Sequence, residues 1–281
     1  MPYSPLPGVG LGLAAASSWG FGDFCGGLAA KRTHVFGVVV FSQLVGLGLL
    51  ILLALVLAEP IPAPIEFLWA GIAGLAGTAG LAALYRGLAT SPMGVVAPVA
   101  AVTSALFPLI VGWLLEGVPA PAQLAGFGLA LCAVWLITRP GRGARIHARN
   151  LALPLIAGLG FGVFLILIDR VSAAAILWPL AGARAVSVLV FVAALILARQ
   201  PVVPAIGQLP LIVLVGLFDS AGNAFYALAA RAGRLDTAAV LGSFYPAMTV
   251  ILARFILKEQ ISRQQGLGLA LAVAAIMLIA L

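Results

Sequence analysis

Ten long apolar runs joined by short connections are the feature that most limits what this chain can fold into. The runs cover residues 8–30, 35–58, 67–90, 94–115, 121–138, 151–168, 173–198, 209–230, 237–257 and 265–281. A helix that crosses a membrane needs about 20 apolar residues, and every run reaches or approaches that length. Barrel strands alternate apolar and polar residues, whereas these runs are apolar on every face. We therefore predict an all-α integral membrane protein with ten transmembrane helices.

Composition excludes a water-soluble protein. Of the 281 residues, 63% are hydrophobic and 8% are charged, whereas a soluble domain has about 25% charged residues. The net charge of +7 would suggest a nucleic-acid partner in a soluble chain. Here the Lys and Arg residues lie mostly between the apolar runs, where they control topology. We expect the surface to contact the lipid bilayer and no nucleic acid.

The two halves of the chain resemble each other, and a basic linker at residues 140–150 separates them. Four features of the first half recur in the same order in the second: Gly20-Phe-Gly22 matches Gly160-Phe-Gly162, Tyr85 matches Tyr226, Glu116 matches Glu259, and Gln123 before Gly126-x-Gly128 matches Gln265 before Gly266-x-Gly268. Five helices is an odd number, so the second copy must cross the membrane upside down. We predict two inverted five-helix repeats, residues 1–139 and 151–281, with the substrate site between them near mid-membrane.

Small residues recur at four-residue spacing in the first helix of each predicted repeat. They are Ser18, Gly22 and Gly26 in one repeat, and Gly158 and Gly162 in the other. This spacing places them on one helix face, where they let two helix backbones approach closely. We expect these residues to mark contacts between helices.

Lys and Arg are distributed unevenly between the two sides of the predicted bundle. The connections after odd-numbered helices hold eleven: Lys31, Arg32, Arg86, Arg139, Arg142, Arg145, Arg149, Arg199, Arg254, Lys258 and Arg263. The other side holds three: Arg170, Arg231 and Arg234. The positive-inside rule then predicts a cytoplasmic linker and places both termini outside.

Signatures of enzymatic sites are missing from the sequence. The two histidines, His34 and His147, have no second His, Cys or acid at metal-ligand spacing, and a metal site needs three or four converging ligands. No Gly-rich loop ends in Lys-Ser or Lys-Thr, so ATP hydrolysis is not expected. We expect no metal, no cofactor and no enzyme activity.

Charged residues within apolar runs cost about 2.5–3.5 kcal/mol each on insertion, so each one requires an explanation. Asp219 is central in the run 209–230, and Asn223 and Tyr226 follow it on the same helix face. Arg184 is central in the run 173–198. Two interpretations are open. Arg184 and Asp219 form an ion pair between neighbouring helices, or they face a watery cavity and meet a charged substrate.

Aromatic residues accompany these charges. Trp19 lies near mid-membrane, and Asp23 follows one turn later on the same face. The buried indole N–H needs a partner, which a polar cavity or a neighbouring helix could supply. The cluster Ser-Phe-Tyr-Pro at 243–246 adds two rings beside a proline that frees a backbone carbonyl. We predict a cavity suited to an aromatic or cationic solute, with these substrate-binding residues: Trp19, Asp23, Thr78, Tyr85, Arg184, Asp219, Asn223, Tyr226, Phe244 and Tyr245.

The chain resembles the EamA-type ten-helix exporters of the drug/metabolite transporter superfamily along essentially its whole length. The motifs that carry the resemblance are Ser-Ser-Trp19-Gly-Phe, Ala-Leu-Tyr85-Arg-Gly-Leu, and Pro246 thirteen residues before Glu259, which is followed by Gly266-x-Gly268. Glu116 occupies the equivalent place in the first repeat, but Thr103 stands where the matching proline is expected. Within the family, the resemblance to YddG-like exporters implies transport of aromatic amino acids and of organic cations such as methyl viologen. It also implies cytoplasmic termini, the opposite of the charge count.

These observations together predict a secondary transporter of a bacterial inner membrane. It exports small solutes, foremost amino acids, by alternating access. An uptake carrier or a broad drug exporter is the alternative within transport, and a membrane enzyme or an assembly scaffold is the rival outside it. An enzyme would place paired acids or histidines at headgroup level, and a scaffold would need no polar stripe in mid-membrane. The sequence leaves open whether the protein is a monomer or an oligomer.

Overall fold

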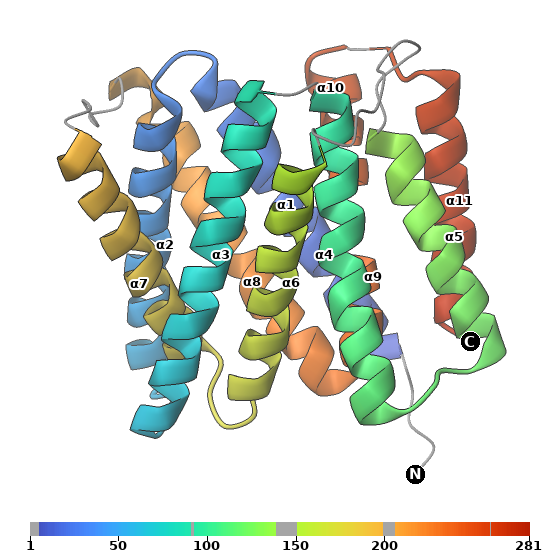
Figure 1. Cartoon of the computed structure of the whole chain (residues 1–281), viewed down its shortest axis with the longest axis horizontal. Helices are drawn as coiled ribbons and strands as arrows, with labels where there is room; N and C mark the ends of the chain where they lie inside the picture. The colour runs from blue at the N-terminus through green and yellow to red at the C-terminus, as the bar shows by residue number, and fades with distance from the viewer. Residues whose placement is uncertain (1–5, 91–92, 139–150, 199–205, 259) are drawn as a thin grey trace.

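Every apolar run forms α-helix, because lipid offers no partner to the backbone and a helix satisfies its own N–H and C=O groups. The computed structural model describes residues 6–90, 93–138, 151–198, 206–258 and 260–281. Its helices run side by side across the molecule (Figure 1). They are α1 (Leu6–Ala30), α2 (Val35–Val56), α3 (Pro64–Thr90), α4 (Met93–Glu116), α5 (Pro121–Thr138), α6 (Ala152–Val171), α7 (Leu177–Ala198), α8 (Leu209–Ala232) after the 3-10 turn Ile206–Gln208, α9 (Leu235–Gly242), α10 (Tyr245–Ile256) and α11 (Arg263–Ile279).

Ten spans result, because α9 and α10 follow each other end to end in the place of one predicted helix. By length and composition, eight spans of the described chain are apolar enough to cross a membrane. The other two are α1, with 25 residues, and α11, with 17. Large apolar side chains such as Leu114 and Leu197 are 80% and 84% exposed on the outside of the bundle, where lipid covers them in a membrane. The predicted fold is confirmed.

The break in the ninth span lies at Ser243 and Phe244, directly before Tyr245 and Pro246. Pro246 has no N–H to donate, and its ring hinders the preceding turn of a continuous helix. The chain tightens at this point: the Phe244 N–H donates to the Leu241 carbonyl at 3.1 Å, three residues back, and the Ser243 hydroxyl donates to the Val240 carbonyl at 2.6 Å. These two bonds pair the Leu241 and Val240 carbonyls within the break.

The helix pairings show the inverted repeat. α1 packs along α8, and α6 packs along α3, so the first helix of each repeat contacts the third helix of the other. In the same way, α6 packs against α4, the fourth helix of the first repeat, and α1 packs against α9 and α10, which together form the fourth span of the second repeat. The last helices of the two repeats, α5 and α11, pack against each other. Each repeat therefore completes the core of the other, and a central site between them contains residues from both.

Close approaches at glycines give the register of the two repeats. A Cβ on Gly20 would lie 2.6 Å from the Tyr245 carbonyl oxygen, beside α10, and one on Gly158 would lie 2.7 Å from the Ala100 carbonyl oxygen, on the equivalent α4. Gly22 faces α8 in the same way that Gly160 faces α3. The equivalents of 20 and 22 are thus 158 and 160, and the sequence match to 160 and 162 is wrong by two residues. The predicted use of these glycines as helix contacts is confirmed.

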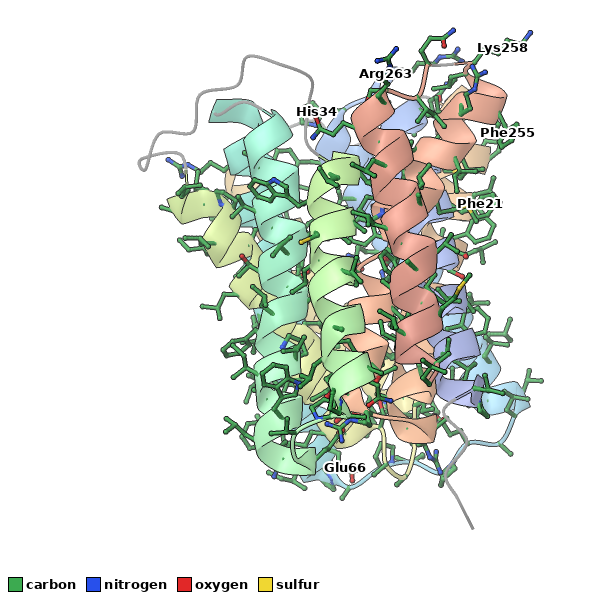
Figure 2. The ribbon with its side chains drawn as sticks, turned by 90° about the vertical axis from the view of Figure 1, so that its right-hand side faces the viewer. Phe21, His34, Glu66, Phe255, Lys258 and Arg263 are labelled. Carbon is green, nitrogen blue, oxygen red and sulfur yellow. The ribbon has the colours of Figure 1, made fainter. Side chains whose placement is uncertain are left out.

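The bundle has two ends of different character. The chain termini lie at one end, which we call the termini end, and α5 finishes and α6 starts at the opposite one, the linker end (Figure 1). His34, Lys258 and Arg263 lie at the linker end and Glu66 lies at the termini end (Figure 2). The predicted division of the connections between two sides therefore holds for the described residues, whereas residues 139–150 lie outside them.

Candidate functional site

A cavity of about 250 Å³ lies in the middle of the bundle, between the two repeats. Its walls come from α1, α2, α3 and α4 of the first repeat and from α6, α7, α8 and α10 of the second. Seven of the ten predicted substrate-binding residues line it: Trp19, Asp23, Thr78, Arg184, Asp219, Asn223 and Tyr245. The cavity therefore collects most of the polar and aromatic residues that the sequence places in mid-membrane.

The remaining three predicted residues do not line this cavity in the described part of the chain. Tyr226 is fully buried, and Phe244 is 4% exposed. The Tyr226 ring centroid lies 6.0 Å from that of Trp19, so Tyr226 supports the cavity wall from behind. Tyr85 is on α3, but its side chain lies outside the described residues.

The predicted ion pair between Arg184 and Asp219 is present. The Arg184 Nη2 lies 2.6 Å from the Asp219 Oδ2, and the Arg184 Nη1 donates to the Gln43 Oε1 at 2.6 Å. Arg184 is 6% exposed, whereas Asp219 is 40% exposed. Both side chains line the cavity, and the guanidinium, held by partners on two helices, is the more buried of the two.

A second carboxylate faces the same space. Asp23 on α1 is exposed in the cavity, and among the described residues it takes part in no ion pair. The cavity thus holds two carboxyl groups, those of Asp23 and Asp219, and one guanidinium, that of Arg184.

Sequence reasoning missed several lining residues. Gln43 is a lone amide within an apolar run, a signal that could have been used, and its role is to hold Arg184. Ser187 accepts a hydrogen bond from the Thr78 hydroxyl at 2.8 Å, which joins α3 to α7. Phe161, Phe164 and Phe191 add an aromatic lining. Nothing in their local sequence separates them from phenylalanines that face lipid.

The Trp19 ring packs against two glycines of the other repeat. A Cβ on Gly222 would lie 2.5 Å from the Trp19 Cδ1, and one on Gly242 would lie 2.9 Å from the Trp19 Cζ3. No larger residue fits at these positions without moving the indole. The ring therefore packs between α8 and α9 with one part and lines the cavity with another, so the packing and the cavity interpretations both describe it.

The model of the EamA-like transporter family matches this chain twice, at residues 6–139 and at residues 150–281. The chain belongs to the EamA-like transporter family. Two matches in one chain agree with the two-repeat architecture, and the family is one of multi-pass membrane transporters.

Other comparisons support the fold. No curated protein matches the chain. A solved structure described as "Crystal structure of protein" is similar to it, with a TM-score of 0.80 and 18% sequence identity over 96% of this chain and 95% of that one. At this identity the likeness extends to the backbone arrangement and not to the ligand.

Exposure differs between the two sides of the cavity in this EamA-like transporter. α8 runs from the linker end to the termini end, and Asp219 on it is 40% exposed. Tyr226, two turns closer to the termini end on the same helix, has 0% exposure. Leu235 and Asp236, at the start of α9, are buried as well. These residues on the termini side of the cavity are therefore more tightly packed than Asp219.

Proposed function

We propose that this EamA-like transporter exports small solutes that carry a protonated amine and an aromatic ring across a bacterial inner membrane. Aromatic amino acids and aromatic organic cations such as methyl viologen are the candidate substrates. Transport proceeds by alternating access of the cavity between the repeats, without a covalent step and without ATP. The single observation that carries the proposal is the set of charged groups in the cavity, where Asp23 has no ion-pair partner among the described residues and Arg184 is already bound by Asp219 and Gln43.

The substrate class follows from what each wall can bind. An ammonium group can pair with Asp23 or with the exposed side of Asp219, and a ring can stack on Trp19 or Tyr245. Arg184 is engaged by Gln43 and Asp219, so it offers little to a substrate carboxylate. We therefore expect the amine, and not the carboxylate, of an amino acid to determine recognition. A cavity of about 250 Å³ suits a small solute, since drug-sized ligands occupy about 300–1,000 Å³.

The proposed orientation follows from the charge count. The positive-inside rule favours a cytoplasmic linker end, and substrate for export loads from that side. An uptake carrier, the alternative, would release its substrate there in the same state, so net flux in vesicles of known orientation distinguishes the two.

Three indole compounds that differ in charge test this function. Tryptamine is cationic, tryptophan is zwitterionic and indole-3-propionate is anionic, while the ring stays the same. We expect flux in proteoliposomes to fall in that order, with indole-3-propionate near background. Asp23→Asn removes one cavity charge and should weaken tryptamine transport more than tryptophan transport. Preference for the anion, or an equal response of all three to Asp23→Asn, would contradict the proposal.

A further inference from the structure

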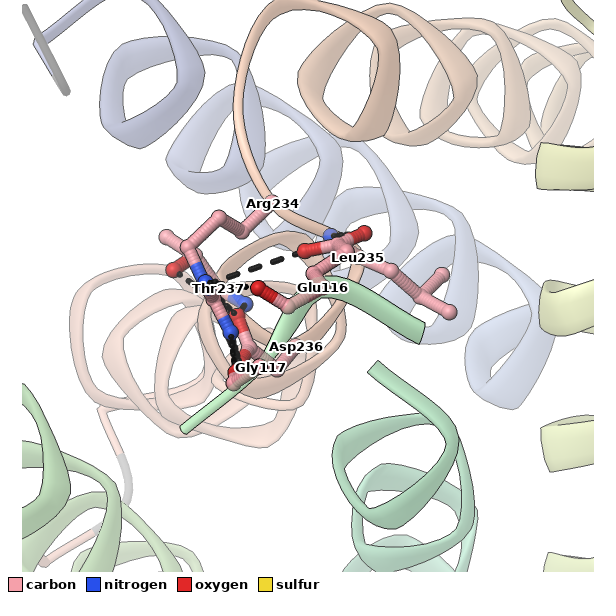
Figure 3. A network of polar contacts seen from close by, with 6 residues as sticks. All are labelled: Glu116, Gly117, Arg234, Leu235, Asp236 and Thr237. Carbon is pink, nitrogen blue, oxygen red and sulfur yellow. Dashed lines mark hydrogen bonds and ion pairs between the residues drawn. The ribbon is translucent and has the colours of Figure 1, made fainter. Parts of the chain in front are cut away.

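A network of charged side chains joins the two repeats at the termini end, below the buried Tyr226. It forms where the connection between α8 and α9 meets the end of α4 (Figure 3). The first repeat contributes Glu116 and Gly117, and the second contributes Arg234, Leu235 and Asp236. None of these residues lines the cavity. The network therefore has a position and a chemistry separate from the proposed substrate site.

Arg234 is at the centre of the network. Its Nη2 lies 2.7 Å from the Asp236 Oδ2 and also donates to the Gly117 carbonyl at 2.6 Å, while its Nε lies 3.7 Å from the Glu116 Oε2. The Leu235 N–H donates to the Glu116 Oε1 at 3.1 Å. The hydrogen bonds to Asp236 raise the pKa of Arg234 above its ordinary value, so the side chain stays cationic. One guanidinium thus holds the end of α4 against the start of α9.

The surrounding backbone fits this role. Gly117 has a φ of +83°, a conformation that side-chain-bearing residues rarely adopt, and its carbonyl accepts from Arg234. Gly112, one turn before Glu116 on α4, lets α4 approach α9 closely, because a Cβ there would lie 3.1 Å from the Asp236 Cβ. One glycine near the end of α4 and one directly after it therefore permit the contact that Arg234 completes.

The network is poised to open. Asp236 is fully buried and depends on Arg234 for its counter-charge, but Arg234 and Glu116 are 26% and 33% exposed. Asp169, at the end of α6, lies near enough to Glu116 for their charges to interact. Glu116 and Asp236 thus share one arginine, and water competes for the contacts between the repeats. Partly exposed ion pairs are individually weak, as suits a contact that must break repeatedly.

We propose that Arg234 is the gating residue of the termini end. It holds Glu116 and Gly117 against the second repeat while the cavity is open toward the linker end, and release of these contacts opens the termini end for substrate exit. This inference rests on the proposed transport function, because only a protein that alternates between two openings needs such a gate. It assigns a role in the transport cycle to a residue that contacts no substrate.

The gate can be tested by distance measurements that need no substrate. In the full chain in lipid nanodiscs, Cys25 and Cys132 are replaced by Ser, and spin labels are attached at Val118→Cys and Leu228→Cys on the termini end. Both positions are exposed and belong to different repeats. A second pair at His34→Cys and Gln260→Cys reports on the linker end, again with one label in each repeat. Pulsed electron paramagnetic resonance then gives the populations of the two states.

The main variant is the double change Arg234→Gln with Asp236→Asn, since Arg234→Gln alone leaves the buried Asp236 unpaired. We expect the population with a long distance at the termini end to rise about two- to tenfold. The linker-end pair should shorten in the same molecules, which local loosening would not cause. Glu116→Gln, which keeps Arg234 and Asp236 together, should shift both pairs in the same direction by a smaller factor. Arg231→Gln removes an exposed arginine at the same end and should shift neither pair.

Unchanged distances at both ends in the double variant and in Glu116→Gln would overturn the proposal. Lengthening at the termini end alone would also overturn it, because Arg234 would then be a local structural residue. If the double variant does not fold, the distances in the Glu116→Gln variant alone decide whether the proposal holds. Tryptamine flux in the same proteins separates this result from the proposed function. A reciprocal shift without flux of any indole compound would retain the gate and remove the substrate class, and flux without a shift would do the opposite.

Discussion

The two ends of the bundle differ in charge and in packing. The described part of the linker end holds six cations, Lys31, Arg32, Arg86, Arg254, Lys258 and Arg263. The described part of the termini end holds five acids, Glu59, Glu66, Glu116, Asp169 and Asp236, with three arginines, and Tyr226, Leu235 and Asp236 are buried on that side of the cavity. Its contacts join the two repeats: the Glu59 carboxylate accepts from the Ile176, Leu177 and Trp178 amides at 2.7–3.1 Å, and Arg170 lies 5.5 Å from the Trp69 ring centroid.

This difference has its origin in side chains, because inverted repeats give both ends related backbones. Arg234 and Asp236 belong to the second repeat, and Arg234 pairs with Asp236 and with Glu116 of the first repeat. We infer that these few charges, rather than the backbone, favour closure at the termini end.

The largest effect is expected from a test of which compartment each end faces. Val118 is 73% exposed at the termini end, and Gln260 is exposed at the linker end. If the charge count is right, an impermeant thiol reagent added to intact cells labels Val118→Cys and leaves Gln260→Cys unlabelled, an all-or-none difference. The alternative is the orientation implied by the family resemblance, with the opposite labelling.

Permeabilised cells provide the control, since both cysteines should then react. Labelling of Gln260→Cys alone in intact cells would reverse the orientation. The tightly packed termini end would then face the cytoplasm, the orientation that the family resemblance implies.

The next largest effect is expected for the ion pair between Arg184 and Asp219, which lies midway between the two ends of the bundle. Asp219→Asn leaves Arg184 buried with only Gln43 as a partner, whereas Arg184→Gln leaves Asp219 facing the cavity and its water. We expect Asp219→Asn to destabilise the protein by about 2–4 kcal/mol, below the about 3–5 kcal/mol of a fully buried pair. Arg184→Gln should cost less than half as much. Thermal unfolding in detergent measures both.

The double variant Asp219→Asn with Arg184→Gln is the matched control. It should regain part of the stability that Asp219→Asn loses, since neither charge is then left alone. Additive losses would show that the two residues are not energetically coupled, despite their short distance.

The sequence predicted the fold well, because the need to satisfy the backbone in lipid leaves few choices. It also predicted the Arg184–Asp219 pair, because the energetic cost of each buried charge demands a partner. It could not predict the packing site of the Trp19 ring, which depends on Gly222 and Gly242 in the other repeat. The same is true of the repeat register, which differs by two residues from the sequence match, and of the contact between Arg234 and Glu116. Each of these depends on which helices cross, and one sequence holds no such information.

A smaller effect is expected for the aromatic residues that line the cavity. Trp19→Ala removes a ring that lines the cavity. Stacking contributes about 0.5–1.5 kcal/mol beyond buried area, so the apparent affinity for tryptophan should fall about 2–15-fold. Threonine has no ring and should lose less. Liposome flux of the two amino acids, after gel filtration confirms folded protein, measures the difference.

Gly222→Ala sharpens this test, because it keeps the ring and displaces it. The added methyl group would lie 2.5 Å from the Trp19 Cδ1. A selective loss of tryptophan transport in both variants would assign the effect to the position of the indole. Equal losses for tryptophan and threonine would leave a cavity without aromatic selectivity.

The smallest expected effect is at Tyr226, which lies on the termini side of the cavity. Its side chain has 0% exposure, and its hydroxyl has no hydrogen-bond partner in the described structure. A buried polar group without a partner costs about 1–3 kcal/mol relative to a paired one. Tyr226→Phe keeps the ring contact with Trp19 and removes only the hydroxyl, so we expect the stability to rise by up to about 1 kcal/mol. The melting temperature should then increase by about 1–4 °C, with tryptophan flux unchanged within about twofold.

A lower melting temperature would show that the hydroxyl is paired, which would place water or a polar group on the termini side of the cavity. A higher melting temperature with strongly reduced flux would mean that the hydroxyl finds its partner only when the termini end opens.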